Sequence, residues 1–183
     1  MKYFRKALGL IKSNEPIIVP TDTVYGLVCR YDSKKAIEKI YKLKKRERKK
    51  PLILLGHNWQ ALKKFVVVNS RDYSLRALLK QWPGPLTLIL PASKKVPKSL
   101  NKGFKTVGVR VPDNKFLLNL LKHCPEGVLA STSANMSGKS DKNPQKEIVK
   151  KIKLFVKAKK GEMSRIPSRI IEPKGSSVKI LRD

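Results

Sequence analysis

A short apolar run that meets a proline and then three polar residues, over 17–23, is the most restrictive stretch of this sequence. Its first three residues, Ile-Ile-Val, are β-branched and pack well in a strand that is covered on both faces. Pro20 has no backbone N–H to donate to a neighbouring strand, so the strand is expected to end there. The Thr-Asp-Thr that follows offers two hydroxyls and one carboxylate, which suit a small polar ligand. A turn with local side-chain to backbone bonds explains the same residues, and this stretch alone favours the turn.

Helices and strands alternate along the whole chain. Apolar residues at helical spacing, with N-caps at Ser33, Asn58 and Asp113, predict helices over 2–13, 34–43, 58–65, 71–81, 113–121 and 143–155. Short apolar or alternating runs predict strands over 17–19, 27–31, 52–55, 86–90, 106–111, 127–130, 169–172 and 178–181, with an exposed loop over 94–102. This interleaving predicts an α/β fold with one domain over 1–183 and a twisted sheet flanked by helices. The short return between the last two strands favours antiparallel pairing, so we expect a mixed parallel and antiparallel sheet.

The net charge of +29, from 42 Lys and Arg against 13 Asp and Glu, implies attraction to polyanions such as nucleotides or RNA. Only ten of those 42 cations are Arg, the residue that binds phosphate in a bidentate manner. The lysines are spread along the whole chain, with nine between residues 139 and 160. A compositional preference for Lys on solvated surfaces therefore explains the charge as well as a role in binding polyanions does.

The few cysteine and histidine residues argue against a structural metal. Cys29 and Cys124 form no Cys-x-x-Cys pair, and His123 directly precedes Cys124, which is poor geometry for chelation. The N-terminal residues do not resemble a secretion signal, and no apolar run is long enough to span a bilayer. We therefore expect reduced thiols, a cytoplasmic location, no membrane association and no metal bound by the protein itself.

Three polar stretches follow predicted strands or helices and could meet at one edge of the sheet, where ligands bind in open α/β folds. They are the Thr-Asp-Thr turn, a cationic segment over 44–50 and a Ser-rich segment over 131–138. The cationic segment would bind phosphate if it were desolvated, but as an exposed helix end it would contribute little. The Ser-rich segment lacks the Gly-x-Ser-x-Gly and Ser-x-x-Lys patterns of serine nucleophiles. The chain also has neither a dinucleotide-binding glycine motif nor a complete phosphate-binding loop.

Taken together, five sequence blocks in order resemble the YrdC-like L-threonylcarbamoyladenylate synthase family. The blocks are Pro20-Thr-Asp-Thr-Val-Tyr-Gly-Leu27, Lys44-x-Arg46 with Pro51-Leu52, Trp82-Pro-Gly-Pro-Leu-Thr-Leu88, Val107-Gly-Val-Arg-Val-Pro112 and Ser131 to Gly138, with looser matches at Pro167-Ser168 and Ile180-Leu-Arg182. The resemblance covers most of the chain and implies a YrdC-like fold. It implies an enzyme that joins L-threonine, bicarbonate and ATP, carrying Mg²⁺, into threonylcarbamoyl-AMP and pyrophosphate. Partner threonylcarbamoyl-transferase proteins would then modify tRNA to N6-threonylcarbamoyladenosine, with transient contact between this chain and both partners.

The resemblance also implies roles for individual residues. Lys44 and Arg46 would be catalytic, with Lys44 stabilising charge near the reacting carboxyl and phosphate groups. L-Threonine would be held by Thr21 or Thr23 together with Arg110, Ser131 and Ser168. ATP would be held by Arg46, Lys50, Thr106, Ser133, Asn135 and Arg182. Such a reaction needs little covalent help from the protein, because positioning and compensation of phosphate charge dominate.

Three positions depart from the pattern of the family. Glu47 stands where many members have Pro, Leu55 where many have His at the end of the strand, and Arg169 where a Thr commonly follows the serine. We therefore assign no histidine to the threonine site, and the role of Ser168 rests on less support than the others.

Two other functions compete with the synthase. A non-catalytic module that binds double-stranded RNA or tRNA on the same basic surface would show steeply salt-dependent binding. A carbamoyl-adenylate enzyme, related to a domain of hydrogenase-maturation carbamoyltransferases, ranks last because those proteins need additional domains that 183 residues cannot hold.

Overall fold

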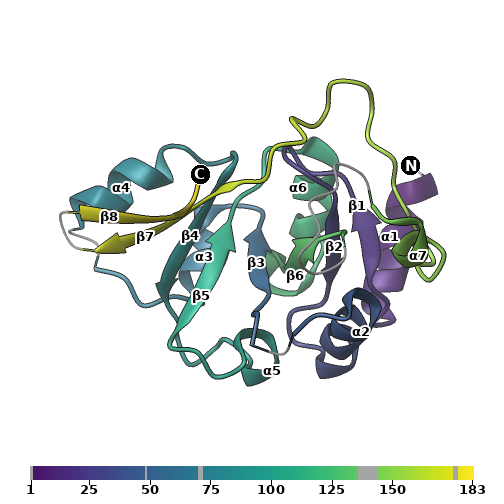
Figure 1. Cartoon of the computed structure of the whole chain (residues 1–183), viewed down its shortest axis with the longest axis horizontal. Coiled ribbons are helices and arrows are strands. Elements are labelled where there is room, and N and C mark those ends of the chain that lie inside the picture. The colour runs from purple at the N-terminus through teal and green to yellow at the C-terminus, as the bar shows by residue number, and fades with distance from the viewer. Residues whose placement is uncertain (1, 48, 70–71, 136–143, 175–176) are drawn as a thin grey trace.

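The computed structural model describes residues 2–47, 49–69, 72–135, 144–174 and 177–183. Its strands form one eight-stranded sheet in the order β1-β2-β6-β3-β5-β4-β7-β8 (Figure 1). β3 pairs parallel with β5 and β4 pairs parallel with β7, whereas the other five neighbouring pairs are antiparallel. The expected mixed α/β sheet is therefore confirmed.

The elements follow the predicted alternation of strand and helix. The strands are β1 (Ile17–Val19), β2 (Gly26–Cys29), β3 (Ile53–Gly56), β4 (Leu86–Pro91), β5 (Thr106–Arg110), β6 (Val128–Ser133), β7 (Arg169–Lys174) and β8 (Ser177–Arg182). The helices are α1 (Lys2–Lys12), α2 (Lys34–Lys44), α3 (Trp59–Lys63), α4 (Tyr73–Leu79), α5 (Lys98–Asn101), α6 (Lys115–Lys122) and α7 (Lys146–Val149), with a 3₁₀ turn at Pro125–Gly127.

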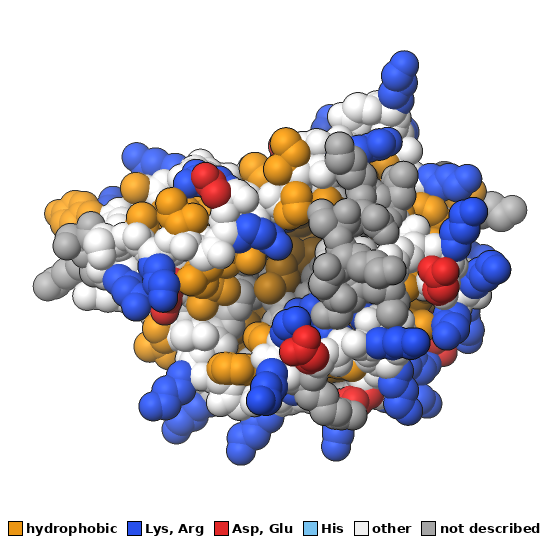
Figure 2. Space-filling view, viewed as in Figure 1, with side chains coloured by type: hydrophobic (Ala, Val, Ile, Leu, Met, Phe, Trp, Pro, Cys, Tyr) orange, Lys and Arg blue, Asp and Glu red, His pale blue; other side chains and the backbone are white. Residues whose placement is uncertain are grey.

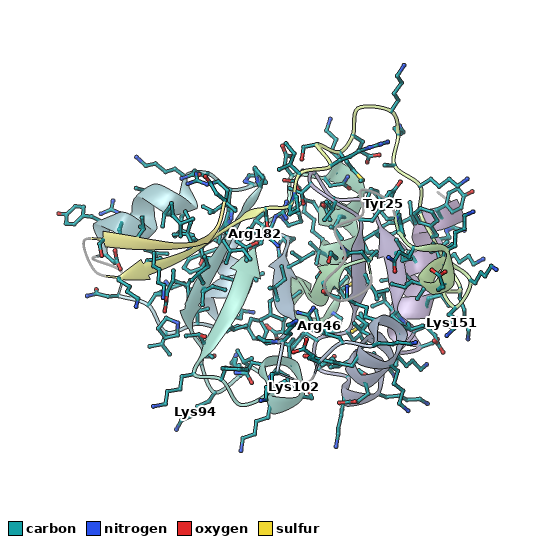
Figure 3. The ribbon with its side chains drawn as sticks, in the orientation of Figure 1. Tyr25, Arg46, Lys94, Lys102, Lys151 and Arg182 are labelled. Carbon is teal, nitrogen blue, oxygen red and sulfur yellow. The ribbon has the colours of Figure 1, made fainter. Side chains whose placement is uncertain are left out.

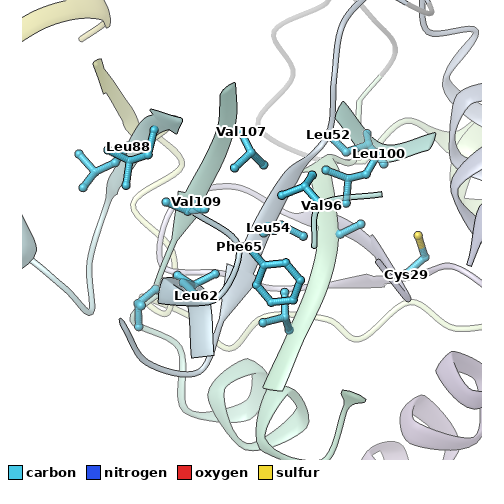
Figure 4. Close-up of a cluster of buried hydrophobic side chains, with 14 of the residues drawn as sticks. Cys29, Leu52, Leu54, Leu62, Phe65, Leu88, Val96, Leu100, Val107 and Val109 are labelled. Carbon is cyan, nitrogen blue, oxygen red and sulfur yellow. The ribbon is translucent and has the colours of Figure 1, made fainter. Parts of the chain in front are cut away.

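The two faces of the sheet carry separate hydrophobic clusters, because successive side chains of a strand point to opposite faces. On one face, α1 and α6 pack against β1, β2 and parts of β3 and β6, through residues that include Leu117, Leu55 and Leu129. On the other face, α2, α3, α4 and α5 pack against most of the strands, and Phe65 and Leu54 lie in that cluster (Figure 4). The first face is thus covered by helices mainly at the β1 side, which leaves room for a site over the middle of the sheet.

Ser33 and Asn58 cap α2 and α3 as predicted, because the Ser33 hydroxyl and the Asn58 side-chain oxygen accept from the backbone N–H groups of Ala36 and Ala61. Asp113 is not the cap of α6. Asn114 takes that position, and its Oδ1 accepts from the backbone N–H of Leu117 at 3.0 Å. The prediction was wrong by one residue because both residue types suit an N-cap.

The helix expected over 143–155 is also wrong in its extent. Only Lys146–Val149 is helical, and residue 143 lies outside the described part of the chain. Leu154 and Val156 instead run beside β1, where the Leu154 carbonyl accepts from Ile18 and the Val156 N–H donates back to Ile18. Both side chains are buried while Lys153 is exposed, so an alternation typical of strands overrides the helical spacing.

Two smaller differences concern the ends of elements. The strand expected over 27–31 ends at Cys29, and the loop expected over 94–102 contains the one-turn helix α5. Within the described ranges, none of the helices has the length and apolar character needed to cross a bilayer.

Candidate functional site

One face of the sheet carries the predicted site residues. Thr106, Gly108 and Arg110 share this face of β5, because the valines between them are buried in the opposite cluster. The register places Thr87 of β4 and Ser131 of β6 on the same face. Residues that are far apart in the sequence therefore line a single surface.

Gly108 opens the centre of this surface. A Cβ atom there would lie 2.6 Å from Ile53 Cγ2 and 3.3 Å from Ile89 Cδ1, so only glycine fits between these side chains without a shift. Ile53 and Ile89 are half-buried, and they lie between the polar ends of the surface at Thr106 and Arg110. Figure 2 shows the molecule hollowed over the middle of the sheet, with hydrophobic side chains inside the hollow.

Arg110 organises one end of the hollow, which we call the Arg110 end. Its Nε donates to Gly84 O at 3.0 Å, Nη1 to Thr23 Oγ1 at 2.9 Å and Nη2 to Asp22 Oδ1 at 2.6 Å. The side chains of Arg110 and Asp22 are 6% and 13% exposed, so this ion pair is largely desolvated. Burial lowers the pKa of Arg110, and the Asp22 carboxylate opposes that shift. The guanidinium is therefore fixed in place as a cation.

Ser168, which precedes β7, and Arg182 at the end of β8 join the Arg110 end from the edge of the sheet that these two strands form. Ser168 Oγ lies 2.9 Å from Thr87 Oγ1. Arg182 donates from Nε and Nη2 to Ser168 O at 2.9 and 2.7 Å, and from Nη2 to Ser168 Oγ at 3.2 Å. Burial lowers the pKa of Arg182, and repulsion from the charge of Arg110 lowers it further.

The Thr-Asp-Thr turn is both a local turn and part of this network. Thr21 Oγ1 donates to Val24 O at 2.7 Å and accepts from the Thr23 N–H at 3.0 Å, as the turn interpretation predicts. Thr23 Oγ1 lies 3.0 Å from Thr21 Oγ1 within the turn and also accepts from Arg110 Nη1. A Cβ on Gly26 would lie 3.4 Å from Ser131 Oγ and 3.5 Å from Thr21 Cγ2, so Ser131 is adjacent to the turn.

Lys44 lies at the opposite side of the site and is the most deeply buried cation of the described residues, at 1% exposure. It ends α2, and its Nζ donates to the backbone carbonyls of Ser133 and Asn135, just after β6. Burial lowers the pKa of Lys44 to about 7, and the nearby charge of Arg46 adds to this shift. The interpretation of Lys44 as part of a solvated helix end is therefore wrong.

Arg46 is half-buried and folds the segment after α2. Its Nε donates to Lys50 O at 2.9 Å and its Nη2 to Pro51 O at 3.0 Å, next to the start of β3. Burial lowers the pKa of Arg46. Figure 3 places Arg46 and Arg182 on either side of the middle of the sheet. Lys44 and Arg46 form what we call the Lys44 end of the hollow.

The remaining predicted residues lie toward the Lys44 end. Ser133 Oγ donates to Asn135 Oδ1 at 2.5 Å beside Lys44, and Thr106 begins β5 at the edge where the parallel strand β3 begins. Lys50 is exposed, its Nζ is paired with Glu47 Oε1 at 2.7 Å, and its backbone carbonyl accepts from Arg46 Nε.

Residues 9–183 match the model of the Sua5/YciO/YrdC family, whose description is "Telomere recombination". The chain belongs to this family. A threonylcarbamoyl-AMP synthase of Photorhabdus laumondii is 36% identical over 136 residues, which cover 74% of this chain and 71% of the relative. The human threonylcarbamoyl-AMP synthase is 35% identical over 136 residues, covering 74% of this chain and 47% of the relative.

Solved structures of the Sua5/YciO/YrdC family share the fold. Pyrococcus abyssi Sua5 complexed with L-threonine has a TM-score of 0.84 at 30% identity, covering 98% of this chain and 53% of that Sua5. The chain thus spans about half the length of that protein. Escherichia coli YciO, at 23% identity and a TM-score of 0.80, shows the fold alone.

Sequence reasoning missed three contributors to the site of this family member. The Asp22 carboxylate was assigned to a turn or to an unspecified polar ligand, and its bond to Arg110 was not predicted. Neither the Gly84 carbonyl nor Thr87 was assigned a role, although both lie in the sequence block over 82–88. The burial of Lys44 had a sequence signal that went unused. Lys44 follows Ile37 and Ile40 by seven and four residues, so it continues the buried stripe of α2.

The three departures from the family pattern have structural explanations. Glu47 binds Lys50, and Leu55 is buried in the cluster under α6. Arg169 pairs with Asp183 at 2.7 Å on the exposed surface. It takes no part in the bonds that the buried Ser168 makes to Thr87 and Arg182.

A separate cavity of about 350 Å³ lies beside α2, away from the hollow. It is lined by Glu15, Pro16, Lys39, Lys42, Leu43, Lys151, Ile152 and Lys153, and we call it the lysine cavity. Glu15 pairs with Lys39 at 2.8 Å and with Lys153 at 3.3 Å. Among the ion pairs of the described residues, none involves Lys42 or Lys151.

Proposed function

We propose that this chain joins L-threonine, bicarbonate and ATP into threonylcarbamoyl-AMP and pyrophosphate. The observation that carries the proposal is the hollow with two differently built cationic ends on one face of a Sua5/YciO/YrdC sheet. Relatives of similar sequence are named threonylcarbamoyl-AMP synthases, and a solved relative holds L-threonine. We propose further that residues 1–183 act as one YrdC-like domain.

The Arg110 end suits the amino acid. A desolvated guanidinium binds a carboxylate strongly, and Thr23, Ser131 and Ser168 offer hydroxyls near it. Ser168 and Thr87 already share a hydrogen bond, so their hydroxyls are held in position. We propose that Arg110, Ser131, Ser168 and the Thr-Asp-Thr turn bind L-threonine.

The Lys44 end suits the triphosphate of ATP. Lys44 is buried and Arg46 is half-buried, and among the described residues no carboxylate is bound to either of them. Charge that develops on phosphate during transfer is stabilised best by such preorganised cations. The amine of L-threonine and bicarbonate would form N-carboxythreonine with loss of water. An oxygen of the N-carboxylate group would then attack the α-phosphorus of ATP, and the bond from that phosphorus to pyrophosphate would break. Thr106, Ser133 and Asn135 would complete the ATP site, with Lys50 beside Arg46 and with Arg182 reaching the nucleotide from the Arg110 end.

Mg²⁺ would be bound through the phosphates of ATP. The described residues contain no cluster of three His, Cys, Asp or Glu side chains, and the Asp22 carboxylate at the Arg110 end is already bound to Arg110. This donor set fits a metal that is carried by its nucleotide, as Mg²⁺ commonly is. A cytoplasmic location and transfer of the product by partner proteins to tRNA remain part of this proposal.

The reaction is tested by pyrophosphate release from ATP and bicarbonate by the purified chain. We expect release that requires L-threonine and is at least about tenfold slower with L-serine, which lacks a single methyl group. Failure of ATP and L-threonine to bind would contradict the proposed function. It would favour the alternative, a non-catalytic RNA-binding module.

Contact with tRNA is a second proposal, supported by the lysine cavity. Lys42 and Lys151 pair with no carboxylate in the part of the chain that the structure describes. Their joint exchange, Lys42→Glu with Lys151→Glu, is expected to weaken tRNA binding and to reduce the salt slope by about 1.4–1.8, the value for two phosphate contacts. Pyrophosphate release without tRNA should stay unchanged. The matched control, Lys94→Glu with Lys98→Glu, removes the same charge from a distant surface (Figure 3 labels Lys94 and Lys151). Equal weakening by both double variants would mean that only net charge matters.

A further inference from the structure

The carboxylate of Asp22 has one oxygen without a hydrogen-bond donor among the described residues. Its Oδ1 accepts from Arg110 at 2.6 Å, whereas Oδ2 is buried and has no such partner. Buried carboxylate oxygens are costly to leave without a donor, so native proteins keep them where a water, an ion or a ligand supplies the missing bond. Asp22 Oδ2 is therefore a candidate contact for a molecule that the site binds.

Arg110, beside Asp22, has donors to spare. A guanidinium carries five N–H groups. Three of them are used by Gly84 O, Thr23 Oγ1 and Asp22 Oδ1, with one bond from each nitrogen. One hydrogen therefore remains on each terminal nitrogen, and a carboxylate can accept from either of them.

A free α-amino acid carries a carboxylate and an ammonium group on the same carbon atom. A site that binds it needs donors and an acceptor side by side, and Arg110 and Asp22 offer this pair within 2.6 Å of each other. We propose that Asp22 Oδ2 accepts a hydrogen bond from the α-ammonium group of L-threonine while Arg110 binds the carboxylate. Asp22 thereby selects a substrate with a free primary amine. This inference rests on the proposed function and adds to it a residue that determines specificity.

Orientation of Arg110 is the competing role for Asp22. A carboxylate that only orients an arginine does so best with both oxygens, as Asp32 does with Arg30, where Oδ1 and Oδ2 each accept one bond at 2.9 and 2.6 Å. Asp22 uses one oxygen and keeps the other buried. The difference between these two Arg–Asp pairs in the same chain favours a second partner for Asp22.

The test compares L-threonine with (R)-3-hydroxybutanoate, which is threonine without its amino group, by calorimetric binding. The wild type is expected to bind L-threonine at least about tenfold more tightly, since a buried charge-assisted bond is lost with the amine. Asp22→Asn keeps an oxygen for Arg110 but loses the negative charge. It should weaken L-threonine binding about tenfold or more and change (R)-3-hydroxybutanoate binding by less than about threefold. Asp32→Asn, which removes the same charge from the exposed pair, should change neither affinity.

Each other outcome overturns the inference. If Asp22→Asn weakened the binding of both ligands equally, Asp22 would act only through Arg110. If it changed neither affinity, a water would be the partner of Oδ2. If Asp22→Asn failed to fold, equal binding of the two ligands by the wild type would overturn the inference without any variant. Absence of L-threonine binding to the wild type would overturn the proposed function as well, which distinguishes the two failures.

Discussion

Replacement of Lys44 by methionine is expected to slow pyrophosphate release by about 10³-fold, because a preorganised cation at the phosphates would be lost. Methionine matches the length of the lysine side chain and fills its buried position. The backbone carbonyls of Ser133 and Asn135 would lose their donor, at a cost of about 1–3 kcal/mol each if they stay buried. Removal of the buried ammonium group offsets part of this cost, so the net loss in the free energy of unfolding should be smaller than the sum of the two carbonyl costs.

The matched control for this variant is Lys42→Met. Lys42 lies in the same last turn of α2 but is exposed. Its replacement should change neither pyrophosphate release nor urea unfolding measurably, because exposed charges contribute little. If the two variants had the same activity, Lys44 would not be catalytic.

The pKa of Lys44, which burial lowers to about 7, makes ATP binding depend on pH. At pH 8 most of the free protein has a neutral Lys44, and bound phosphates favour its ammonium form. The wild type should therefore take up close to one proton when ATP binds, and Lys44→Met should not. Calorimetry in buffers of different ionisation enthalpy measures this uptake directly.

The same lowered pKa has a consequence for stability. The pKa of Lys44 is about 7 in the folded chain and has its ordinary value of 10.5 in the unfolded chain. Between these two pH values, the unfolded chain carries a proton on Lys44 that the folded chain lacks. Stability rises with pH wherever the unfolded state binds more protons. The contribution of Lys44 to the free energy of unfolding is thus least favourable below pH 7 and improves up to about pH 10.5.

Much of the fold was predictable because local signals agree with tertiary packing. The β-branched run at Ile17 and the caps at Ser33 and Asn58 each act over a few residues, and each gave a correct element. The helix expected to reach 155 failed because Leu154 and Val156 pair with β1, which is distant in sequence. Local spacing cannot reveal that partner.

The site was less predictable than the fold because its contacts join distant parts of the chain. Asp22 and Arg110 are 88 positions apart, and Thr87 and Ser168 are 81 apart. The resemblance to a family supplied Arg110 and Ser168, but it gave no indication that Asp22 binds Arg110 through one oxygen. The buried position of Lys44 was available from the stripe that it continues in α2, whereas its two carbonyl partners follow β6 and become visible only in the folded chain.

Replacement of Arg110 by lysine is expected to raise the KM for L-threonine about 10²-fold or more while ATP affinity stays within about threefold. Lysine keeps the charge but has no planar fork, so it cannot bridge Gly84 O, Thr23 Oγ1 and Asp22 Oδ1 and still bind a carboxylate. Two charge-assisted bonds to the substrate, at about 1.5–3 kcal/mol each, account for a loss of this size. The rise in KM is confined to L-threonine because Lys44 and Arg46, which are proposed to bind the phosphates of ATP, lie at the other end of the hollow.

The control for Arg110→Lys is Arg30→Lys, since Arg30 also binds an aspartate through two nitrogens. That pair is exposed, with side chains 29% and 34% accessible, so its loss should cost no more than about 1 kcal/mol and leave both substrates unaffected. Arg110→Lys should in addition lower the free energy of unfolding by about 1–3 kcal/mol, because buried acceptors at Gly84 and Thr23 lose their donor. Steady-state kinetics with each substrate varied, together with urea unfolding, separates the two effects. A fall in ATP affinity as large as that for L-threonine would contradict the division of the hollow into two ends, because only a shared site would lose both ligands.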